Sequence, residues 1–584
     1  MAEVVGDGSL DHKGNPAIRS ATGGWKRAVL VFGPELCERM TTLGVATNLV
    51  TYLTNDLHLS NTKAPNIVTN FLGTSFMLCL LGGFIADTYI GRFWTVAIAA
   101  TIQFLGMLVL TILTSLPSLR SPHCVHDCPP AKAKQLSLLY LALYLSALGT
   151  GGIKSNVSAF GADQFDKNEP KEQKLMSYFF NWFFVSISVG ALFSLTVLVY
   201  IQDNVGRGWG YGICAAAMLL AIVIFLAGTR MYRYKAPSGS PLTRIAKVVV
   251  AAVRKHKLEL PRDQSSLYGS LGPGKDAEDP ATDQSARHTN QFRHPYQYRF
   301  LDKAAVLEPS DDEIYDENPK PWRLCTVTQI EEVKMVLRLL PIWATTITFY
   351  TVYAQMLTFS VVQGSKMDRK MGSFLFPSAS SAAFLFATIM VTVTVYDRFI
   401  VPLMRKLTGH PQGITTLQRI GVGLVVAILA MVVAATVERR RVRIARENKL
   451  LDSPDVPVPM SVLWILPQYV LVGIGEAFTY IGQLEFFYRE SPDGMQSLGV
   501  GLFLSTISLG FFLSSFLVSV VDSVTRGGGS GGWIVNNLNR SRLDDFYWLL
   551  AVVSSVNLVL YLICARWYKY RRAVSHSTGT SAHF

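Results

Sequence analysis

The stretch VFGPELCERMTTLGVATNLV, residues 31–50, places three ionisable side chains inside an apolar segment. Glu35, Glu38 and Arg39 are spaced i, i+3 and i+4, so a helix would carry all three on one face. A charge at bilayer depth costs roughly 2.5–3.5 kcal/mol on insertion scales unless it faces water, a ligand or a partner charge. The stretch therefore predicts a membrane helix whose charged face lines a polar cavity.

The composition is typical of a polytopic membrane protein. Of the 584 residues, 50% are hydrophobic and 16% are charged, whereas soluble domains carry about 25% charged residues. The net charge of +13 is expected to come from basic loops that face an anionic cytoplasmic leaflet. No basic module with interleaved aromatics suggests nucleic-acid binding. No nucleophile triad, phosphate loop or metal-ligand cluster suggests an enzyme, a cofactor or a bound metal.

Twelve apolar stretches of about 20 residues, the length of a bilayer-spanning helix, follow one another along the chain. They are centred near Val45, Met77, Leu105, Tyr144, Ser188, Leu219, Phe349, Phe386, Val426, Val472, Ile507 and Val556. The sequence thus predicts an all-α membrane protein with two bundles of six transmembrane helices. We expect a cytoplasmic N-terminal tail at 1–27, a first bundle at 28–231, a long cytoplasmic central loop at 232–334, a second bundle at 335–568 and a cytoplasmic C-terminal tail at 569–584.

Lys and Arg residues set the expected orientation. The central loop is rich in both, and an even number of helices puts this loop and both termini on one side, which the positive-inside rule makes cytoplasmic. The basic run ERRRVRIARENK, residues 438–449, would then lie outside and conflicts with that rule. Within the central loop, residues 242–260 predict an amphipathic helix that lies on the membrane or bridges the two halves.

Two features concern short loops. Cys124 and Cys128 share one loop and could pair if it is extracytoplasmic, with neighbouring histidines leaving a metal site as the alternative. The run GGFIADTYIGR, residues 82–92, contains Asp87, Gly91 and Arg92 and resembles the major-facilitator loop signature. Its glycines allow a tight turn, and its aspartate can face a partner charge at a helix end. The resemblance implies the major-facilitator fold and a gating loop, and the alternative is an ordinary solvated turn.

Several longer motifs carry a more specific resemblance. ELCER, residues 35–39, matches the E-x-x-E-R motif of the proton-coupled peptide and nitrate transporter family. FNWFFVSISVGAL, residues 180–192, resembles that family's fifth-helix signature but has Ser188 where the family usually has Asn. RSATGGW, ALGTGGIKSNVSAFGADQF and LRLLPIWA resemble the plant nitrate-transporter branch. The chain is identified as a member of this family and is similar to the subfamily of the plant dual-affinity nitrate transporter.

The resemblance implies roles for the charges at bilayer depth. Glu35, Glu38 and Arg39 would couple transport to protons. The alternative is a structural cluster of salt bridges whose protonation state does not change. Lys154 and Glu476 match residues that form a gating or coupling pair between the halves, and the alternative is that each finds its own partner. Moving a charge against 100 mV costs about 2.3 kcal/mol, so import of an anion into a negative-inside cell needs more than one proton per anion.

At the substrate site the sequence departs from the residues of that relative. Tyr353 occupies the position of a histidine that contacts nitrate in the well-known nitrate transporter of the subfamily. A protonated histidine donates a charge-assisted hydrogen bond to an anion, whereas a tyrosine donates a neutral one. The resemblance implies five further lining positions. Leu43, Leu72 and Phe511 are the same residues as in that relative. Thr47 stands where the relative has an apolar residue, and Leu357 stands where it has a threonine. Chloride is therefore an expected substrate alongside nitrate. The alternative is that Tyr353 only fills space and the substrate binds elsewhere.

Thr95 matches a phosphorylation switch of the same relative, and Arg92 at −3 suits a basophilic kinase. A phosphate there would loosen or reorder packing between the halves.

We therefore expect a proton-coupled symporter of a small inorganic anion, nitrate or chloride, that works by alternating access. The expected location is the plasma membrane of a plant cell, with the vacuolar membrane as the alternative. Alternative functions are transport of peptides or hormone-like organic acids, and a nitrate sensor with little transport. Expected partners are protons, the anion and the lipid bilayer, with a protein kinase acting on Thr95 and a homodimer as further candidates and no nucleic acid.

Overall fold

The computed structural model describes residues 4–119, 131–166, 169–236, 239, 241–261, 267–268, 298–307, 322–408, 414–454, 456–492, 495–526 and 532–568. Cys124, Cys128 and the predicted tail 569–584 lie outside these residues. The chain forms two compact units. Unit 1 comprises Met1–Gly239, Trp343–Glu485 and Gly501–Tyr561, and unit 2 comprises Ser240–Ile342, Phe486–Val500 and Leu562–Phe584.

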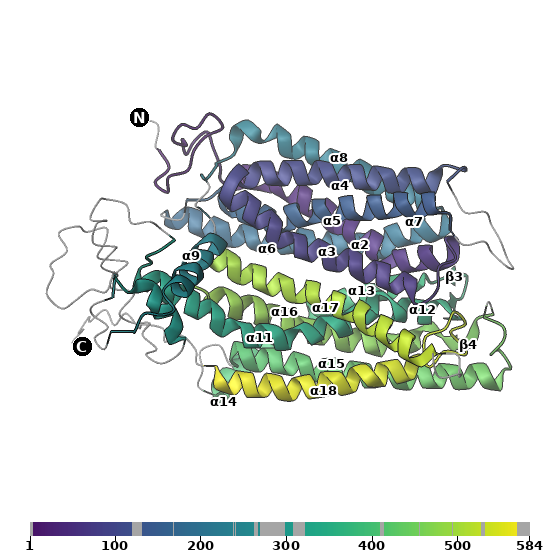
Figure 1. Ribbon diagram of the computed structural model, residues 1–584. Helices are drawn as coiled ribbons and strands as arrows, with labels where there is room; N and C mark the ends of the chain where they lie inside the picture. The colour runs from purple at the N-terminus through teal and green to yellow at the C-terminus, as the bar shows by residue number, and fades with distance from the viewer. Residues whose placement is uncertain are drawn as a thin grey trace. The chain divides into compact units, whose positions relative to one another are not determined.

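The first half of unit 1 consists of long helices and two short ones (Figure 1). They are α1 (Trp25–Ala28), α2 (Phe32–Thr51), α3 (Lys63–Ile85), α4 (Gly91–Ser115), α5 (Ala133–Ala162), α6 (Pro170–Phe193), α7 (Val199–Asn204) and α8 (Arg207–Ala227). Wide π-helical turns at Tyr52–Asp56, Ala86–Ile90 and Ser194–Leu198 prolong α2, α3 and α6. The last of these turns joins α6 to α7 as one span.

The second half of the chain also consists mainly of helices. Its helices are α11 (Val327–Leu357), α12 (Phe359–Ser365), α13 (Ala382–Val395), α14 (Val401–Thr408), α15 (Thr416–Glu447), α16 (Leu466–Glu490), α17 (Gln496–Arg526) and α18 (Leu543–Trp567). Four short strands lie between them. Strand β1 (Met367–Asp368) pairs in parallel with β4 (Val458–Ser461), and β2 (Lys370–Met371) pairs in antiparallel with β3 (Phe374–Leu375).

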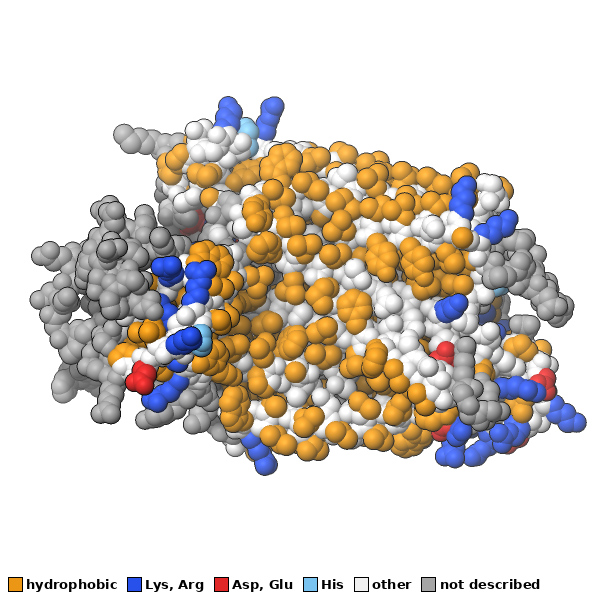
Figure 2. All heavy atoms as spheres, viewed as in Figure 1, with side chains coloured by type: hydrophobic (Ala, Val, Ile, Leu, Met, Phe, Trp, Pro, Cys, Tyr) orange, Lys and Arg blue, Asp and Glu red, His pale blue; other side chains and the backbone are white. Residues whose placement is uncertain are grey.

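The bundle consists of twelve membrane helices, as the sequence predicts. Among the described residues, ten helical runs are long and apolar enough to cross a membrane, and one of them, Lys63–Ser115, contains both α3 and α4. Helix α2 supplies the remaining span, and its charged and hydroxyl side chains lower its hydropathy. Large apolar side chains such as Leu105, Val223 and Val556 are exposed. Figure 2 shows hydrophobic side chains covering the visible flanks of the long helices, a surface suited to lipid.

Helices α15 and α16 pack closely at a glycine. A Cβ added at Gly423 would lie 2.8 Å from the carbonyl oxygen of Gly475 and 3.0 Å from the backbone nitrogen of Thr479. At Gly421, two residues earlier, the closest atom would be a ring carbon of Tyr561 at 3.4 Å. The two glycines of one helix therefore differ in how much space a methyl group would find.

This difference predicts opposite outcomes for two alanine variants. Gly423→Ala should destabilise the protein by about 1–3 kcal/mol because the added methyl group meets backbone atoms that cannot give way. Gly421→Ala should be neutral or slightly stabilising, since alanine favours a helix by up to about 1 kcal/mol over glycine. Thermal unfolding of the detergent-purified variants measures both, and equal melting temperatures would show that α15 and α16 are not in this close contact.

The basic run of residues 438–449 contains a buried ion pair. Glu438 and Arg441 are fully buried, with Arg441 Nη2 2.7 Å from Glu438 Oε1. Arg441 also donates to the side-chain oxygen of Asn539 at 2.7 Å and to the carbonyl of Leu538 at 2.9 Å. One charge of each sign is thus neutralised inside the protein, which lowers the number of free cations that oppose the positive-inside orientation.

Unit 2 contains the predicted amphipathic helix as α9 (Pro241–Arg254). Its residues Val248, Ala251 and Ala252 pack on the 3₁₀ segment Arg299–Ala305 and on the start of α11. Lys334 of α11 lies 2.6 Å from Asp302 and 2.9 Å from Glu331, so ion pairs border this core. Part of the apolar face of α9 is therefore covered by unit 2 itself.

Candidate functional site

The three charges of α2 lie together on one face, as their spacing predicts, with both carboxylates buried and the Arg39 side chain partly exposed. Glu35 is 2% exposed and Glu38 is fully buried. Arg39 Nε lies 3.6 Å from Glu35 Oε1 and 3.9 Å from Glu38 Oε2. One guanidinium thus faces two carboxylates, and the described residues give Glu38 Oε2 no hydrogen bond. A buried carboxylate with an unused oxygen can hold a proton.

A second cation from α5 completes the cluster. Lys154 Nζ lies 3.5 Å from Glu38 Oε1 and 4.5 Å above the ring centre of Phe76 on α3. The same Glu38 oxygen accepts a hydrogen bond of 2.8 Å from the Thr42 hydroxyl, which contacts Thr150 of α5 at 3.0 Å. Glu38 is therefore the centre of the cluster, because it binds both cations and a hydroxyl.

Glu476 of α16 does not pair with Lys154 in this conformation. The described residues form no ion pair between the two, and Glu476 Oε2 is buried without a hydrogen-bond partner among them. Arg39 is near enough to Glu476 to interact with it electrostatically. A Lys154–Glu476 pair stays a prediction for another conformation of the two halves, and here Lys154 is held by Glu38.

Tyr353 of α11 lies beside the cluster on the side of the second half. It is 8% exposed, and its ring packs edge-to-face on Phe511 of α17 with the ring centres 6.2 Å apart. Phe511 stacks on Phe76 at 6.3 Å, and Phe76 carries Lys154 on its face. Arg39 acts electrostatically on Tyr353. The aromatic rings therefore connect the ion cluster of the first half to the tyrosine of the second.

The other predicted lining residues are buried too. Leu43, Leu72, Leu357 and Phe511 are at most 7% exposed, and Thr47 is fully buried. The Thr47 hydroxyl donates to the carbonyl of Leu43 in its own helix at 2.7 Å. The Thr47 hydroxyl is thus already used as a donor within α2. Of the three departures, Tyr353, Thr47 and Leu357, only Tyr353 leaves a side-chain donor for an anion.

Sequence analysis missed several residues of this site. Thr42 and Phe76 lie one turn after Glu38 and Leu72, and Tyr350 and Tyr480 lie one turn from Tyr353 and Glu476. The Tyr350 hydroxyl is buried without a hydrogen-bond partner among the described residues. Helical periodicity applied to the predicted residues would have found all four, because side chains at i+3 and i+4 share a face.

The loop residues form an ion network at the end of the bundle where α4 begins. Arg92 lies 3.4 Å from Asp87 and 2.6 Å from Asp163 at the end of α5. Gly91 adopts φ +77°, which favours glycine over residues with a Cβ. Thr95, one turn later, is 6% exposed and its hydroxyl donates to the Gly91 carbonyl at 2.9 Å. A kinase could reach this hydroxyl only after α4 moves.

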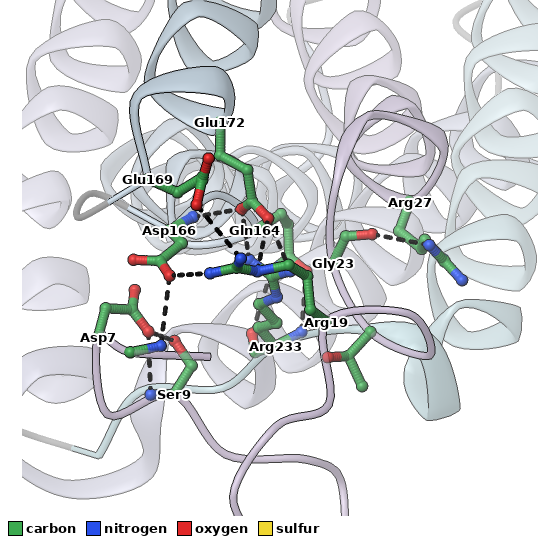
Figure 3. Close-up of polar contacts among 12 residues, drawn as sticks. Asp7, Ser9, Arg19, Gly23, Arg27, Gln164, Asp166, Glu169, Glu172 and Arg233 are labelled. Atoms are coloured by element: carbon green, nitrogen blue, oxygen red, sulfur yellow. Dashed lines mark hydrogen bonds and ion pairs between the residues drawn. The ribbon is translucent and has the colours of Figure 1, made fainter. Parts of the chain in front are cut away.

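The N-terminal segment is bound at the same end through a second network (Figure 3). Arg19 contacts Asp166 at 2.9 Å, Glu169 at 3.3 Å and Glu172 at 3.6 Å. Glu172 also pairs with the buried Arg233, 2.7 Å away, in the segment that follows α8. These contacts hold the chain before α2 and the chain after α8 against the turn between α5 and α6.

Asp7 anchors the beginning of the same segment. Lys235 Nζ lies 3.2 Å from its carboxylate. Burial of Asp7 opposes ionisation, but the Ser9 hydrogen bond and the Lys235 charge together hold its pKa below the ordinary value. Asp7 is therefore a carboxylate at neutral pH and contributes to docking the segment.

Comparison with known proteins agrees with this architecture. The profile of the POT family matches residues 93–534. Among relatives from Arabidopsis thaliana, Protein NRT1/PTR FAMILY 6.2 is 51% identical over 566 residues, covering 96% of this chain and 94% of the relative. Protein NRT1/PTR FAMILY 6.3 is 50% identical over 567 residues, with the same two shares.

Solved structures show the same fold. An auto-inhibited POT family peptide transporter superimposes with a TM-score of 0.68 at 21% identity, covering 94% of this chain and 99% of that one. A peptide transporter POT in complex with sulfate gives 0.62 at 17% identity, covering 96% and 98%. The twelve-helix bundle therefore has the fold of these solved POT family structures.

Proposed function

Because the chain belongs to the POT family of proton-coupled transporters, we propose that it is a symporter of protons and a small inorganic anion, nitrate or chloride. The family membership and the fold make the protein a multi-pass membrane transporter and not an enzyme. The identity of the cargo and the plasma membrane as its location are our proposals. The observation that carries the anion proposal is the charge balance of the buried cluster.

The charges of the site can be counted. Glu35 and Glu38, when ionised, balance Arg39 and Lys154, and Glu476 adds one uncompensated negative charge. Protonation of Glu476 and of one cluster carboxylate leaves the site with a charge of +1. A monovalent anion then neutralises it, which favours its burial away from water. Anion binding and protonation thus stabilise each other in this scheme.

The same count predicts electrogenic transport. Two protons with one monovalent anion carry one positive charge inward, so a negative-inside potential of 100 mV would contribute about 2.3 kcal/mol per cycle. After the anion and protons leave, Glu38 can bind Lys154 and Arg39 again, and the empty site returns to a closed ion cluster. A neutral hydroxyl donor at Tyr353 suits a weakly hydrated monovalent anion, because it offers a hydrogen bond without a competing negative charge.

The two halves are joined at the end of the bundle that follows α2. Asn61 donates to the carbonyl of Asn536 at 2.8 Å, and Asn66 donates to the Ser519 hydroxyl at 3.0 Å. Under the proposed orientation this is the extracytoplasmic side. Alternating access would break these contacts and form others, among which we propose the Lys154–Glu476 pair.

Phosphorylation of Thr95 would act on the packing of α4 against α5 and so alter the exchange between the two conformations.

Tyr353→His tests the anion site. We expect currents induced by nitrate to rise relative to those induced by chloride, because a protonated histidine donates a charge-assisted bond that suits a planar oxyanion. The relative selectivity should change by about tenfold, the factor that corresponds to about 1.4 kcal/mol.

The measurement compares currents in oocytes that express the wild type and the variant at equal surface levels, with dipeptides as a third substrate. Tyr144→His, on a lipid-exposed flank, is the control and should leave selectivity unchanged. An unaltered ratio in Tyr353→His would remove this residue from the substrate site, and transport of dipeptides in place of either anion would overturn the anion proposal.

A further inference from the structure

A chain of hydrogen bonds leads from Glu38 through α5 to α4. The Thr42 hydroxyl donates to Glu38 Oε1 at 2.8 Å, and the hydroxyl oxygens of Thr42 and Thr150 lie 3.0 Å apart. The side-chain amide of Gln103 on α4 donates to the Thr150 hydroxyl at 3.2 Å. These four side chains belong to residues that are at most 4% exposed, so their bonds are shielded from bulk water. We call this chain of bonds the Gln103 relay.

Close packing of α4 on α5 holds Gln103 in place. A Cβ added at Gly149 would lie 2.4 Å from the Cβ of Gln103 and 2.7 Å from the carbonyl oxygen of Ala99. A residue with a side chain at position 149 would therefore push α4 away from α5. The glycine permits the approach that brings the Gln103 amide to Thr150, the next residue of α5.

The number of protons fixes the direction of the relay. Each threonine hydroxyl has a single proton to donate. Because Thr42 donates to Glu38, Thr150 must donate to Thr42 and can only accept from Gln103. A Gln103 amide turned the other way would take the Thr150 proton and leave the two threonine oxygens with no proton between them. Every bond therefore points toward Glu38, a direction that suits a carboxylate, and bonds aligned in this way polarise one another.

The relay acts on Glu38 together with the charges around it. Lys154 of α5 contacts the same oxygen, Oε1, at 3.5 Å, whereas Arg39 of α2 lies 3.9 Å from Oε2. Glu35 of α2 and the Cys79 thiol of α3 are near enough to interact with Glu38 electrostatically. Oε1 is thus occupied by the relay and Lys154. Oε2, to which the described part of the chain donates no hydrogen bond, is the oxygen left for a proton.

We propose that Gln103 is a positioning residue for proton binding at Glu38. It orients the two threonine hydroxyls so that they support the ionised carboxylate, and it thereby directs an arriving proton to Oε2. This role rests on the proposed function, because it assigns a coupled proton to Glu38. It gives α4, which contributes no charge to the cluster, an influence on the pH at which transport begins.

The first test is the pH profile of anion uptake in oocytes. Gln103→Met keeps the approximate size of the side chain but removes its donor, and Thr150→Val removes the hydroxyl between Gln103 and Thr42. Either change weakens the support of the carboxylate, so Glu38 takes up its proton at a higher pH. We expect the external pH of half-maximal uptake to rise by about 0.3–0.5 units, which corresponds to about a two- to threefold change in proton binding.

Two matched variants control for packing. Thr150→Ser keeps the hydroxyl and should keep the wild-type midpoint. Gln468→Met removes another fully buried glutamine, which donates to Ser360 of α12, and should also leave the midpoint unchanged. If Thr150→Val or Gln103→Met is too unstable to express, the other variant carries the comparison.

The second test follows Glu38 itself and does not need transport. Infrared difference spectra of the purified full-length protein in lipid nanodiscs record the carbonyl band of protonated carboxyl groups, and the part of this band that Glu38→Gln lacks belongs to Glu38. We expect the Glu38 band to titrate at a higher pH in Gln103→Met and Thr150→Val than in the wild type and Thr150→Ser. A band that titrates at the wild-type pH in both variants would overturn the proposal, as would the absence of a Glu38 band from the wild type.

The two tests separate the relay from the proposed function. Uptake that stays pH-dependent in Glu38→Gln, with an infrared band that moves in Gln103→Met, would refute the coupling role of Glu38 and support the relay. Uptake that loses its pH dependence in Glu38→Gln, with midpoints and band unmoved in Gln103→Met and Thr150→Val, would support coupling and refute the relay.

Discussion

Glu38→Gln is expected to abolish proton-driven uptake. Glu38 is fully buried, contacts Arg39 and Lys154, and accepts a hydrogen bond from Thr42. Glutamine keeps the shape and the Thr42 bond but removes the negative charge that the two cations share. Coupling then loses its central carboxylate, and we expect the uptake rate at acidic external pH to fall on the order of a hundredfold, which corresponds to about 2.7 kcal/mol.

The sign of the pH effect separates coupling from simple damage. Wild-type uptake should rise as external pH falls, because protonation creates the positive charge that the anion neutralises. Glu38→Gln should show a residual rate that no longer changes with pH. Glu447→Gln, an exposed carboxylate at the end of α15, is the matched control and should keep the wild-type profile. Full, pH-dependent uptake by Glu38→Gln would remove this residue from proton coupling.

Arg441→Met should cause the largest loss of stability. Both members of the Glu438–Arg441 pair are fully buried, so the substitution leaves a buried carboxylate without its cation. Breaking such a pair from one side costs about 3–5 kcal/mol, more than a surface ion pair contributes. The freed oxygens of Asn539 and Leu538 lose their donor as well.

The loss should be specific to the buried arginine. Arg443→Met, two residues later on the exposed face of α15, should change the melting temperature little. Glu438→Gln combined with Arg441→Met should recover part of the stability, since no unpaired charge remains. Equal thermal unfolding of Arg441→Met and Arg443→Met would show that the pair is solvated and contributes nothing.

Much of the fold follows from the sequence because membrane helices are local features. Length and hydropathy determine each span, and the i, i+3, i+4 spacing correctly brings Glu35, Glu38 and Arg39 together. Hydropathy alone does not identify helix α2 as a membrane span. Its charged and hydroxyl residues lower its mean hydropathy, although its position in the bundle makes it a span.

The partners of the buried charges could not be read from the sequence. Lys154 had three acidic candidates at bilayer depth, Glu35, Glu38 and Glu476, and only the folded structure shows that Glu38 holds it here. Glu438 and Arg441 stand in the basic run that conflicts with the positive-inside rule, and their spacing does not show that both are buried. Arg207 is more than 150 positions away from Lys366 and Arg369 along the chain, and it lines one pocket with them only in the folded bundle.

We propose that two protons accompany each monovalent anion. Labelled nitrate or chloride uptake and inward current can be measured in the same voltage-clamped oocyte. We expect one positive charge to move inward per anion, and the current to disappear in Glu38→Gln. Uptake that carries no net charge, or a net negative charge per anion, would contradict the two-proton cycle and the charge count at Glu35, Glu38 and Glu476 on which it rests.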